Sequence, residues 1–193
     1  MIRPPTVKVI NQGFIAHEGD EIVDASSSVT LVEAAGKRII VDTGAAKDRN
    51  TLLGSFDAIH ISPDRIDIVV NTHLHRDHIG CNDLFRKARF YAHRLESPPV
   101  GTVALNAGLR LVEGVEIVPT PGHTLGSVSV LVYAERRYAI CGDAIPTRAN
   151  FEKHVPPFIN VDSKLALKSM DLLSAWGQTV IPGHDALFVV PGK

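Results

Sequence analysis

Hydrophobic and polar positions along the 193-residue chain follow two different periods. Short runs rich in valine, isoleucine and leucine, bounded by glycine, proline or asparagine, are typical of β-strands. Two longer segments, 48–58 and Asp162 to about Trp176, carry apolar residues at helical spacing, and a shorter helix is predicted over 82–88. The predicted strands cover residues 7–10, 29–33, 38–42, 66–71, 89–93, 110–113, 115–119, 127–133, 138–141 and 179–181.

Two stretches show neither period. Residues 11–28 are polar and irregular, and residues 145–160 form a long segment with aromatic and basic patches. Binding residues are often carried on loops that a rigid scaffold positions. Because both stretches adjoin strands that end in polar residues, we expect them to form loops that contact a substrate.

Polar residues able to bind a metal follow five of the predicted strands. Each lies in a turn rich in glycine or threonine, directly after the apolar run. Catalytic groups often lie on loops at one end of a sheet, so these side chains are predicted to converge. They are Asp42, His73 with His75, His123, Asp143 and His184.

The densest group lies in the sequence THLHRDHIG, residues 72–80. Alternate side chains of an extended segment point the same way, so His73 and His75 emerge on one face. Asp77 and His78 follow a turn and can face a second position, which indicates two metals. Imidazole and carboxylate ligands suit zinc, and also manganese or iron.

An isolated histidine is more often an ordinary surface or packing residue. That interpretation is kept for His17, His60, His93 and His154. It does not suit the cluster, because the chain has only nine histidines and three of them fall within six residues. Taken alone, His123, His184 and Asp143 would also be ordinary turn residues, and their assignment depends on the cluster.

Length and composition limit the classes of protein that remain. A chain of this length is most simply one domain, residues 1–193, and it can bury a core without disulfides. The net charge of -1 gives no electrostatic reason to expect nucleic acid or a membrane surface as partner. No apolar run is long enough for a membrane-spanning helix, and the start lacks the apolar core of a signal peptide. With only Cys81 and Cys141, both interpreted as small buried hydrophobic residues, a cytoplasmic location is expected.

The order of the motifs resembles that of the metallo-β-lactamase superfamily, and the resemblance covers essentially the whole chain. It implies an α+β fold, a four-layer αββα sandwich of two mixed β-sheets with helices outside and metals in a cleft along one edge. The motifs that carry it are Asp42-Thr43-Gly44, His73-x-His75-x-Asp77-His78, His123, Asp143 and His184.

The resemblance also implies a role for each of these side chains. One metal is held by His73, His75 and His123, and a second by Asp77, His78 and His184. Asp143 bridges both metals together with a water or hydroxide, and Asp42 orients a ligand loop without binding metal. The implied cofactor is two Zn²⁺ per chain, with iron or manganese as alternatives. Asp143 and Asp77, the latter by taking up a proton, are the implied catalytic residues.

Departures from the patterns of the subfamilies narrow the chemistry. True β-lactamases of this fold commonly have cysteine at the position of Asp143 and no metal-binding histidine at that of His78. The ligand set is similar to that of glyoxalase II, without its helical C-terminal extension. The resemblance therefore implies a compact, stand-alone dinuclear hydrolase that uses a metal-bridging hydroxide on a small ester, thioester, lactone or phosphoester.

Residues of the two predicted loops are assigned to the substrate. Phe14, Phe151 and Phe158 would form an apolar wall, and Arg148 or Lys153 would face an anionic group. The expected partner is thus a small molecule. The oligomeric state is left open, a homodimer being one alternative.

Three other functions remain as alternatives. One is an enzyme similar to persulfide dioxygenases, with a single iron in the first site. Another is a phosphodiesterase or RNA nuclease, which the near-neutral charge disfavours. The last is a metal-binding scaffold without turnover, which the ligand set disfavours because a structural zinc site is closed by four ligands.

Overall fold

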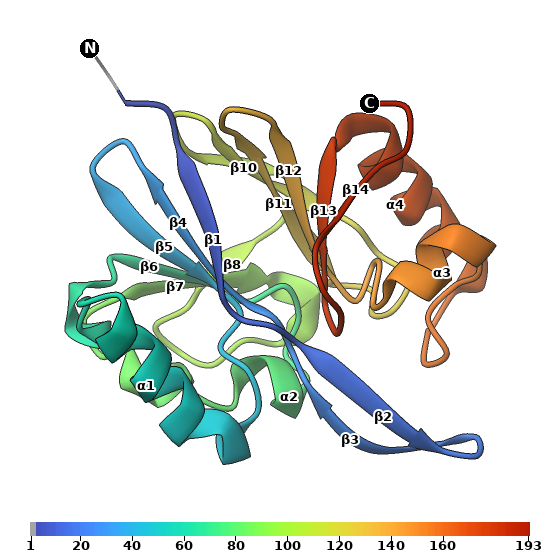
Figure 1. The fold of residues 1–193 in the computed structure, drawn as a ribbon, viewed down its shortest axis with the longest axis horizontal. Helices are drawn as coiled ribbons and strands as arrows, with labels where there is room; N and C mark the ends of the chain where they lie inside the picture. Colours follow the sequence, from blue (N-terminus) through green and yellow to red (C-terminus); the bar gives the residue numbers. More distant parts are fainter. Residues whose placement is uncertain (1–2) are drawn as a thin grey trace.

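A computed structural model of the protein describes residues 3–193, and two six-stranded β-sheets dominate it (Figure 1). Both sheets are mixed, since β5 to β8 and the pair β12 and β13 run parallel whereas the other neighbours are antiparallel. The first sheet has the order β1 (Thr6–Asn11), β4 (Val29–Ala34), β5 (Lys37–Val41), β6 (Ile68–Val70), β7 (Arg89–His93) and β8 (Val103–Leu105). The second has the order β14 (Phe188–Val189), β13 (Thr179–Pro182), β12 (Arg137–Gly142), β11 (Val128–Tyr133), β10 (Val115–Pro119) and β9 (Leu109–Val112).

Helices cover the outer faces of the two sheets (Figure 1). Helix α1 (Arg49–Ala58) packs on the first sheet, and α4 (Ser163–Trp176) packs on the second. Asp162 caps α4, because its carboxylate accepts hydrogen bonds from the backbone N–H groups of Lys164 and Leu165 at 2.9 and 3.0 Å. The remaining helical elements are short: α2 (Arg76–Ile79), α3 (Arg148–Lys153) and the 3₁₀ turns Ala46–Asp48, Pro63–Arg65, Asn82–Leu84 and Arg94–Glu96.

The alternation of side chains along each strand separates three apolar layers. Ile39 of β5 and Ile140 of β12 lie in the layer between the two sheets. Their neighbours point the opposite way: Ile40 packs with α1, and Ala139 packs with α4. A strand that is buried on both faces therefore appears in the sequence as a continuous apolar run. This arrangement confirms the predicted αββα sandwich.

The stretch 11–28 is not an irregular loop. It folds into an antiparallel hairpin of β2 (Phe14–Glu18) and β3 (Glu21–Ser26), which extends away from the two sheets (Figure 1). Gly19 occupies the turn with φ of 61°. The strands were missed because their outer halves are exposed, so polar residues such as Glu18 and Asp24 interrupt the apolar pattern.

Other differences from the predicted elements concern short segments. The stretch 145–160 contains helix α3, and the helix predicted over 82–88 is only a 3₁₀ turn at Asn82–Leu84. Strands β8 and β14, with three and two residues, were not predicted because such short runs carry no clear period. Along residues 3–193, no helix is both long and apolar enough to cross a membrane.

The directions of the strands explain why the polar turns meet. Strands β5 and β6 are parallel and therefore end at the same edge of the first sheet. Strands β12 and β13 are parallel as well. Strand β10 runs in the same direction as β12, because both are antiparallel to β11. The loops after these strands consequently gather along one edge of the sandwich.

Candidate metal centre

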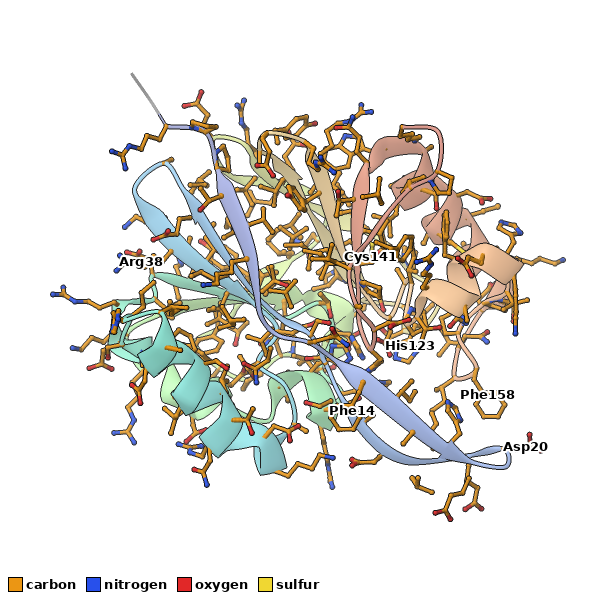
Figure 2. The ribbon with its side chains drawn as sticks, viewed as in Figure 1. Phe14, Asp20, Arg38, His123, Cys141 and Phe158 are labelled. Carbon is orange, nitrogen blue, oxygen red and sulfur yellow. The ribbon has the colours of Figure 1, made fainter. Side chains whose placement is uncertain are left out.

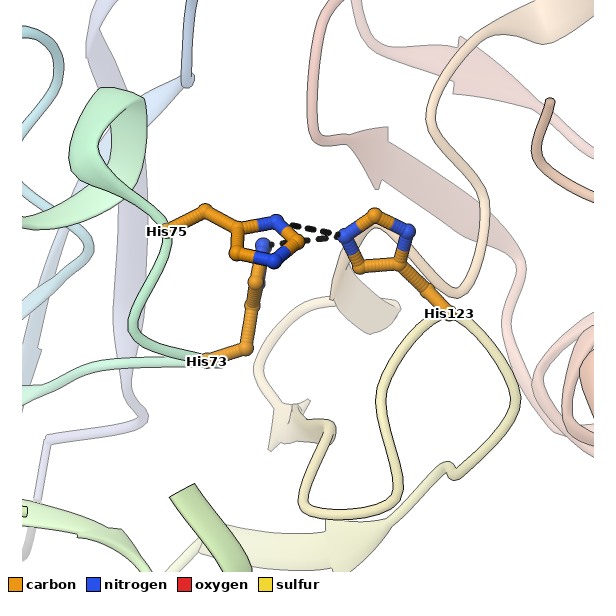
Figure 3. Close-up of side chains that lie close together, drawn as sticks. All are labelled: His73, His75 and His123. Atoms are coloured by element: carbon orange, nitrogen blue, oxygen red, sulfur yellow. Dashed lines mark hydrogen bonds between the residues drawn. The ribbon is translucent and has the colours of Figure 1, made fainter. Parts of the chain in front are cut away.

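Three imidazoles from two sheets form the first group of side chains (Figure 3). His73 and His75 follow β6, and His123 follows β10. The Nε2 atom of His123 lies 3.2 Å from Nε2 of His73 and 2.9 Å from Nδ1 of His75. His73 and His123 are buried, whereas His75 is exposed. The group therefore opens to solvent at one position only.

The second group contains two imidazoles and a carboxylate. His78 lies on α2 and His184 follows β13, and their Nε2 atoms are 3.3 Å apart. The Oδ2 atom of Asp77 lies 3.5 Å from Nε2 of His184 and 4.0 Å from Nε2 of His78. Both imidazoles are buried, and the Asp77 side chain is 28% exposed.

Asp143 lies between the two groups and turns one oxygen toward each. Its Oδ1 atom is 3.3 Å from Nε2 of His78 and 3.2 Å from Nε2 of His184. Its Oδ2 atom is 3.4 Å from Nε2 of His123. Oδ1 is buried and accepts no hydrogen bond from any residue that the structure describes. The structure thus brings together all seven side chains that the sequence assigns to metal binding.

The spacing of these atoms fits a pair of metal ions. Ligands at 2.0–2.1 Å in a tetrahedral zinc site lie about 3.3 Å from one another, and the separations here run from 2.9 to 3.5 Å for most neighbouring atoms. Imidazole and carboxylate donors also suit zinc, manganese or iron.

The outer nitrogens of the imidazoles give a second test. Nδ1 of His123 donates to the backbone carbonyl of Ile159 at 2.6 Å, and Nδ1 of His184 donates to that of Ser26 at 3.0 Å. Nδ1 of His78 faces the Asp42 carboxylate at 2.8 Å. A neutral imidazole that donates from Nδ1 has a lone pair on Nε2. When both imidazoles are neutral, the lone pairs of His78 and His184 face each other at 3.3 Å, which a cation between them relieves.

Burial and charge set different protonation preferences in the two groups. Burial lowers the pKa of His73 well below its ordinary value, and burial also lowers the pKa of His75. At His78 the effect of burial is outweighed by the Asp143 and Asp42 carboxylates, which raise its pKa well above the ordinary value. Burial likewise opposes ionisation of Asp143, yet His78 and His184 hold the pKa of this carboxyl well below its usual range. A cation that enters the second group must therefore displace a proton.

Asp42 forms hydrogen bonds with Thr72 and His78, at the two ends of the loop that carries four of the candidate ligands. Its Oδ1 accepts from the backbone N–H of Thr72 at 2.8 Å, and its Oδ2 accepts from Thr72 Oγ1 at 2.7 Å as well as from His78. The side chain is buried, and it lies outside both groups of potential ligands. These contacts are compatible with the orienting role that the resemblance implies for Asp42.

A cavity of about 1010 Å³ opens from the two groups. Its walls come from the β2–β3 hairpin and from the segment after α3, where Phe158 is 68% exposed. Figure 2 marks Phe158 and the hairpin turn at Asp20. The larger apolar side chains along these walls include Ile15, Ile22, Val23, Val155, Phe158 and Ile159.

Three of the residues assigned to the substrate lie outside the cavity lining. The Phe14 ring contacts the Lys47 ammonium, which lies 4.7 Å from the ring centre. Arg148 pairs with Glu152 at 2.6 Å, and Phe151 packs against Phe188 with ring centres 5.0 Å apart. None of Phe14, Arg148 and Phe151 lines the cavity, whereas Phe158 and Lys153 do.

Two features of the cavity were not predicted from the sequence. The first is the inner face of the hairpin, which carries Ile15 and Ile22; these two apolar residues were the available signal in the polar stretch. The second is Arg76, which lies between two ligands in sequence and lines the cavity. Its position within the densest motif was the signal, but a charged residue on an exposed turn is usually only solvated.

Similarity to known proteins agrees with this geometry. A sequence model of the metallo-beta-lactamase superfamily matches residues 22–102. A Methanocaldococcus jannaschii protein named "probable metallo-hydrolase" is 38% identical over 181 residues, which cover 94% of this chain and 87% of that protein. An N-acyl homoserine lactonase of Bacillus cereus is 30% identical over 199 residues, which cover 80% of this chain and 79% of that enzyme. The crystal structure of a Thermotoga maritima protein described as a metallo-β-lactamase matches with a TM-score of 0.82 at 24% identity, over 97% of this chain and 100% of that one.

Proposed function

The chain belongs to the metallo-β-lactamase superfamily and is a metal-dependent hydrolase, and we propose that it binds two zinc ions and cleaves a small lactone or ester. The observation that carries this proposal is the position of Asp143, whose two oxygens face two separate groups of ligands. A carboxylate shared in this way offsets the repulsion between neighbouring divalent cations. Thioesters and phosphoesters belong to the same proposal as further substrates.

Each part of the chemistry falls to particular residues. Two divalent cations, when bound, lower the pKa of water toward 7 and polarise the oxygen of the scissile group. Asp143 and the six other ligands fix where these effects act. The Asp77 carboxylate is partly exposed at the cavity, so we assign to its Oδ1 atom the uptake of the proton that the attacking water loses.

The chain has no need of a nucleophilic side chain. Burial raises the pKa of both the Cys81 and the Cys141 thiol, so neither is a thiolate near pH 7. Neither cysteine lines the cavity that opens from the ligands. Attack by water is therefore the route that we propose for hydrolysis.

The cavity supports a substrate with an apolar part and an anionic group. Apolar side chains line it along the 155–159 segment and along the hairpin, which also contributes His17 and Asp24. Arg76 and Lys153 also line it, and within residues 3–193 neither forms an ion pair. The lactonase from Bacillus cereus makes a lactone with an apolar acyl chain the first compound to test.

The decisive experiment combines metal analysis with hydrolysis assays. Protein purified without added metal is expected to contain about two zinc ions per chain and to hydrolyse a lactone, ester, thioester or bis-phosphodiester reporter. His75→Ala and Asp143→Ala should abolish turnover, whereas His154→Ala should not, because that exposed histidine pairs with Asp171 away from the centre. One iron per chain with oxygen uptake and no hydrolysis would instead establish the dioxygenase alternative, and absence of bound metal would refute the proposal.

The role of Arg76 has its own measurement. In Arg76→Met, the ratio of kcat/KM for an anionic ester to that for a neutral ester of equal length should fall at least tenfold. Turnover of the neutral ester should change little. An unchanged ratio would exclude Arg76 from substrate binding and leave the hydrolase assignment intact.

A further inference from the structure

The Glu96 carboxylate joins the two loops that carry the first group of imidazoles. Glu96 ends the 3₁₀ turn after β7. Its Oε2 accepts from the backbone N–H of Leu74 at 3.0 Å, and Leu74 separates His73 from His75. Its Oε1 accepts from Thr124 Oγ1 at 2.7 Å, and Thr124 directly follows His123.

A third hydrogen bond and a glycine complete the contact. The backbone N–H of Gly126 donates to Glu96 Oε1 at 3.1 Å. A Cβ atom on residue 126 would lie 2.5 Å from that oxygen and 2.8 Å from the Glu96 Cγ. The backbone of Gly126 is outside the left-handed region, so the missing side chain serves the close approach of Glu96.

The arrangement matches that of Asp42 at the second group. Asp42 ties Thr72 to the His78 imidazole. Glu96 ties the loop of His73 and His75 to the loop of His123, which comes from the other sheet. A carboxylate that accepts several N–H and O–H donors is held firmly. Loops held in this way keep imidazoles oriented before a metal arrives.

We propose that Glu96 is a positioning residue that holds the two halves of the first metal site in register. The proposal rests on the metal centre described above, and it concerns metal affinity before it concerns turnover. Loss of a residue that orients metal ligands typically lowers metal affinity 10–100-fold. The loss is expected at the site of His73, His75 and His123 and not at the other.

Three variants of this contact make graded predictions. Glu96→Ala removes all three hydrogen bonds, whereas Glu96→Gln keeps one acceptor oxygen and turns an amide toward the remaining donors. Zinc affinity of the weakened site should therefore fall 10–100-fold in the alanine variant and less in the glutamine variant. Gly126→Ala should act like Glu96→Ala, because the new methyl group displaces the carboxylate. Glu33→Ala is the control, since Glu33 lies on β4 and its carboxylate pairs with Arg38 of β5.

The measurement is zinc binding to metal-free protein in competition with a chromophoric chelator, together with the visible spectrum of the cobalt-loaded protein. Far-UV circular dichroism and Tm establish that each variant is folded. In a double-mutant cycle, Gly126→Ala should lower affinity in the native background and change it little in Glu96→Ala. That non-additivity separates displacement of Glu96 from a general effect on the loop.

Two results would overturn the proposal. One is native zinc affinity and an unchanged cobalt spectrum in folded Glu96→Ala. The other is an equal effect of Gly126→Ala in both backgrounds. Because the readout is metal binding, the outcome does not depend on whether the wild type hydrolyses any test substrate, and a failed hydrolase assay is distinguishable from a failed role of Glu96.

Discussion

Asp42 combines an unusual backbone conformation with three hydrogen bonds. Its φ is 54°, in the left-handed region that aspartate tolerates better than most residues. This conformation turns the side chain back under the ligand loop, where it meets Thr72 and His78. A strained residue that is held by its surroundings often marks a functional site.

Asp42→Asn tests this contact. An amide nitrogen in place of Oδ2 would face the Nδ1–H of His78, and two donors cannot bond to each other. Zinc affinity at the second group should therefore fall about 10–100-fold, as measured by chelator competition. Asp83→Asn, which removes an exposed pair with Arg49, should leave the affinity unchanged; equal losses in the two variants would contradict the role of Asp42.

The convergence of the candidate metal ligands could be predicted from the sequence, and the residues that line the cavity could not. Several histidines and aspartates that directly follow strands are rare, so their order along the chain was sufficient to predict that they converge. Phe14 and Phe151 lie in stretches that the sequence predicts as loops, but the sequence does not show which way their side chains point. In the structure one contacts Lys47 and the other packs on Phe188.

At the scale of the element, α4 shows how one helix face stabilises the second sheet. Leu173 is fully buried among residues of that sheet, whereas its neighbour Leu172 is 50% exposed. Both residues are leucines of the same helix. They differ only in which way the helix turns them.

Alanine at these two positions should separate burial from helix propensity. Leu173→Ala should lower the free energy of unfolding by about 2–5 kcal/mol, and Leu172→Ala should change it by less than about 0.5 kcal/mol. Urea denaturation followed by circular dichroism measures both. Similar losses would mean that the α4 interface is not the one described.

A second element-scale contact makes stability depend on pH. Asp67, just before β6, accepts from the backbone N–H of Arg38 and from the Lys37 ammonium, each at 2.9 Å. The Arg38 hydrogen bond, with help from Lys37, holds the pKa of Asp67 below its ordinary value of 3.8. A carboxyl with a lowered pKa contributes stability above its ordinary pKa, and this contribution is lost as pH falls through the folded-state pKa.

Asp67→Asn should therefore cost stability near neutral pH and little in acid. The expected loss near pH 6–7 is at most about 1 kcal/mol, since one hydrogen bond is involved and the exposed pair with Lys37 adds little. The difference should shrink as pH falls below 3.8. Urea denaturation at several pH values measures it, with Asp20→Asn at the exposed hairpin turn as control. A difference that is constant with pH would count against this assignment.

Long buried elements could be predicted, and short or exposed ones could not. Strands β5 and β11 are buried on both faces and stand out as apolar runs. The β2–β3 hairpin alternates weakly because solvent reaches much of it. Its position depends instead on backbone contacts at its base, where Ser27 N–H donates to the carbonyl of Asp77 and Ser28 N–H to that of Gly183. Such long-range contacts leave no local pattern.

At the scale of the whole molecule, the metal centre connects the two sheets. The candidate ligands His73, His75, Asp77 and His78 follow a strand of the first sheet, and His123, Asp143 and His184 follow strands of the second. Each group of ligands draws on both sheets. Metal binding should therefore stabilise the sandwich as well as supply chemistry.

Removal of metal should lower the Tm of the wild type, and added zinc should restore it. A ligand present at 1,000 times its Kd stabilises the native state by about 4 kcal/mol per site. Differential scanning calorimetry before and after chelation measures this change. Asp143→Ala should show a much smaller change in Tm on chelation. A wild-type Tm that does not change on chelation would contradict the link between the metals and the two sheets.

The split of the ligands between early and late parts of the chain also sets an order of events during synthesis. The ribosome releases the four ligands at 73–78 long before His184, the last one. The first group lacks a member until His123 has emerged, and the second lacks one until His184 has emerged. The complete centre can therefore form only after residue 184 has emerged from the ribosome, and a metal ion bound earlier would be held by a partial set of ligands that the later strands must join.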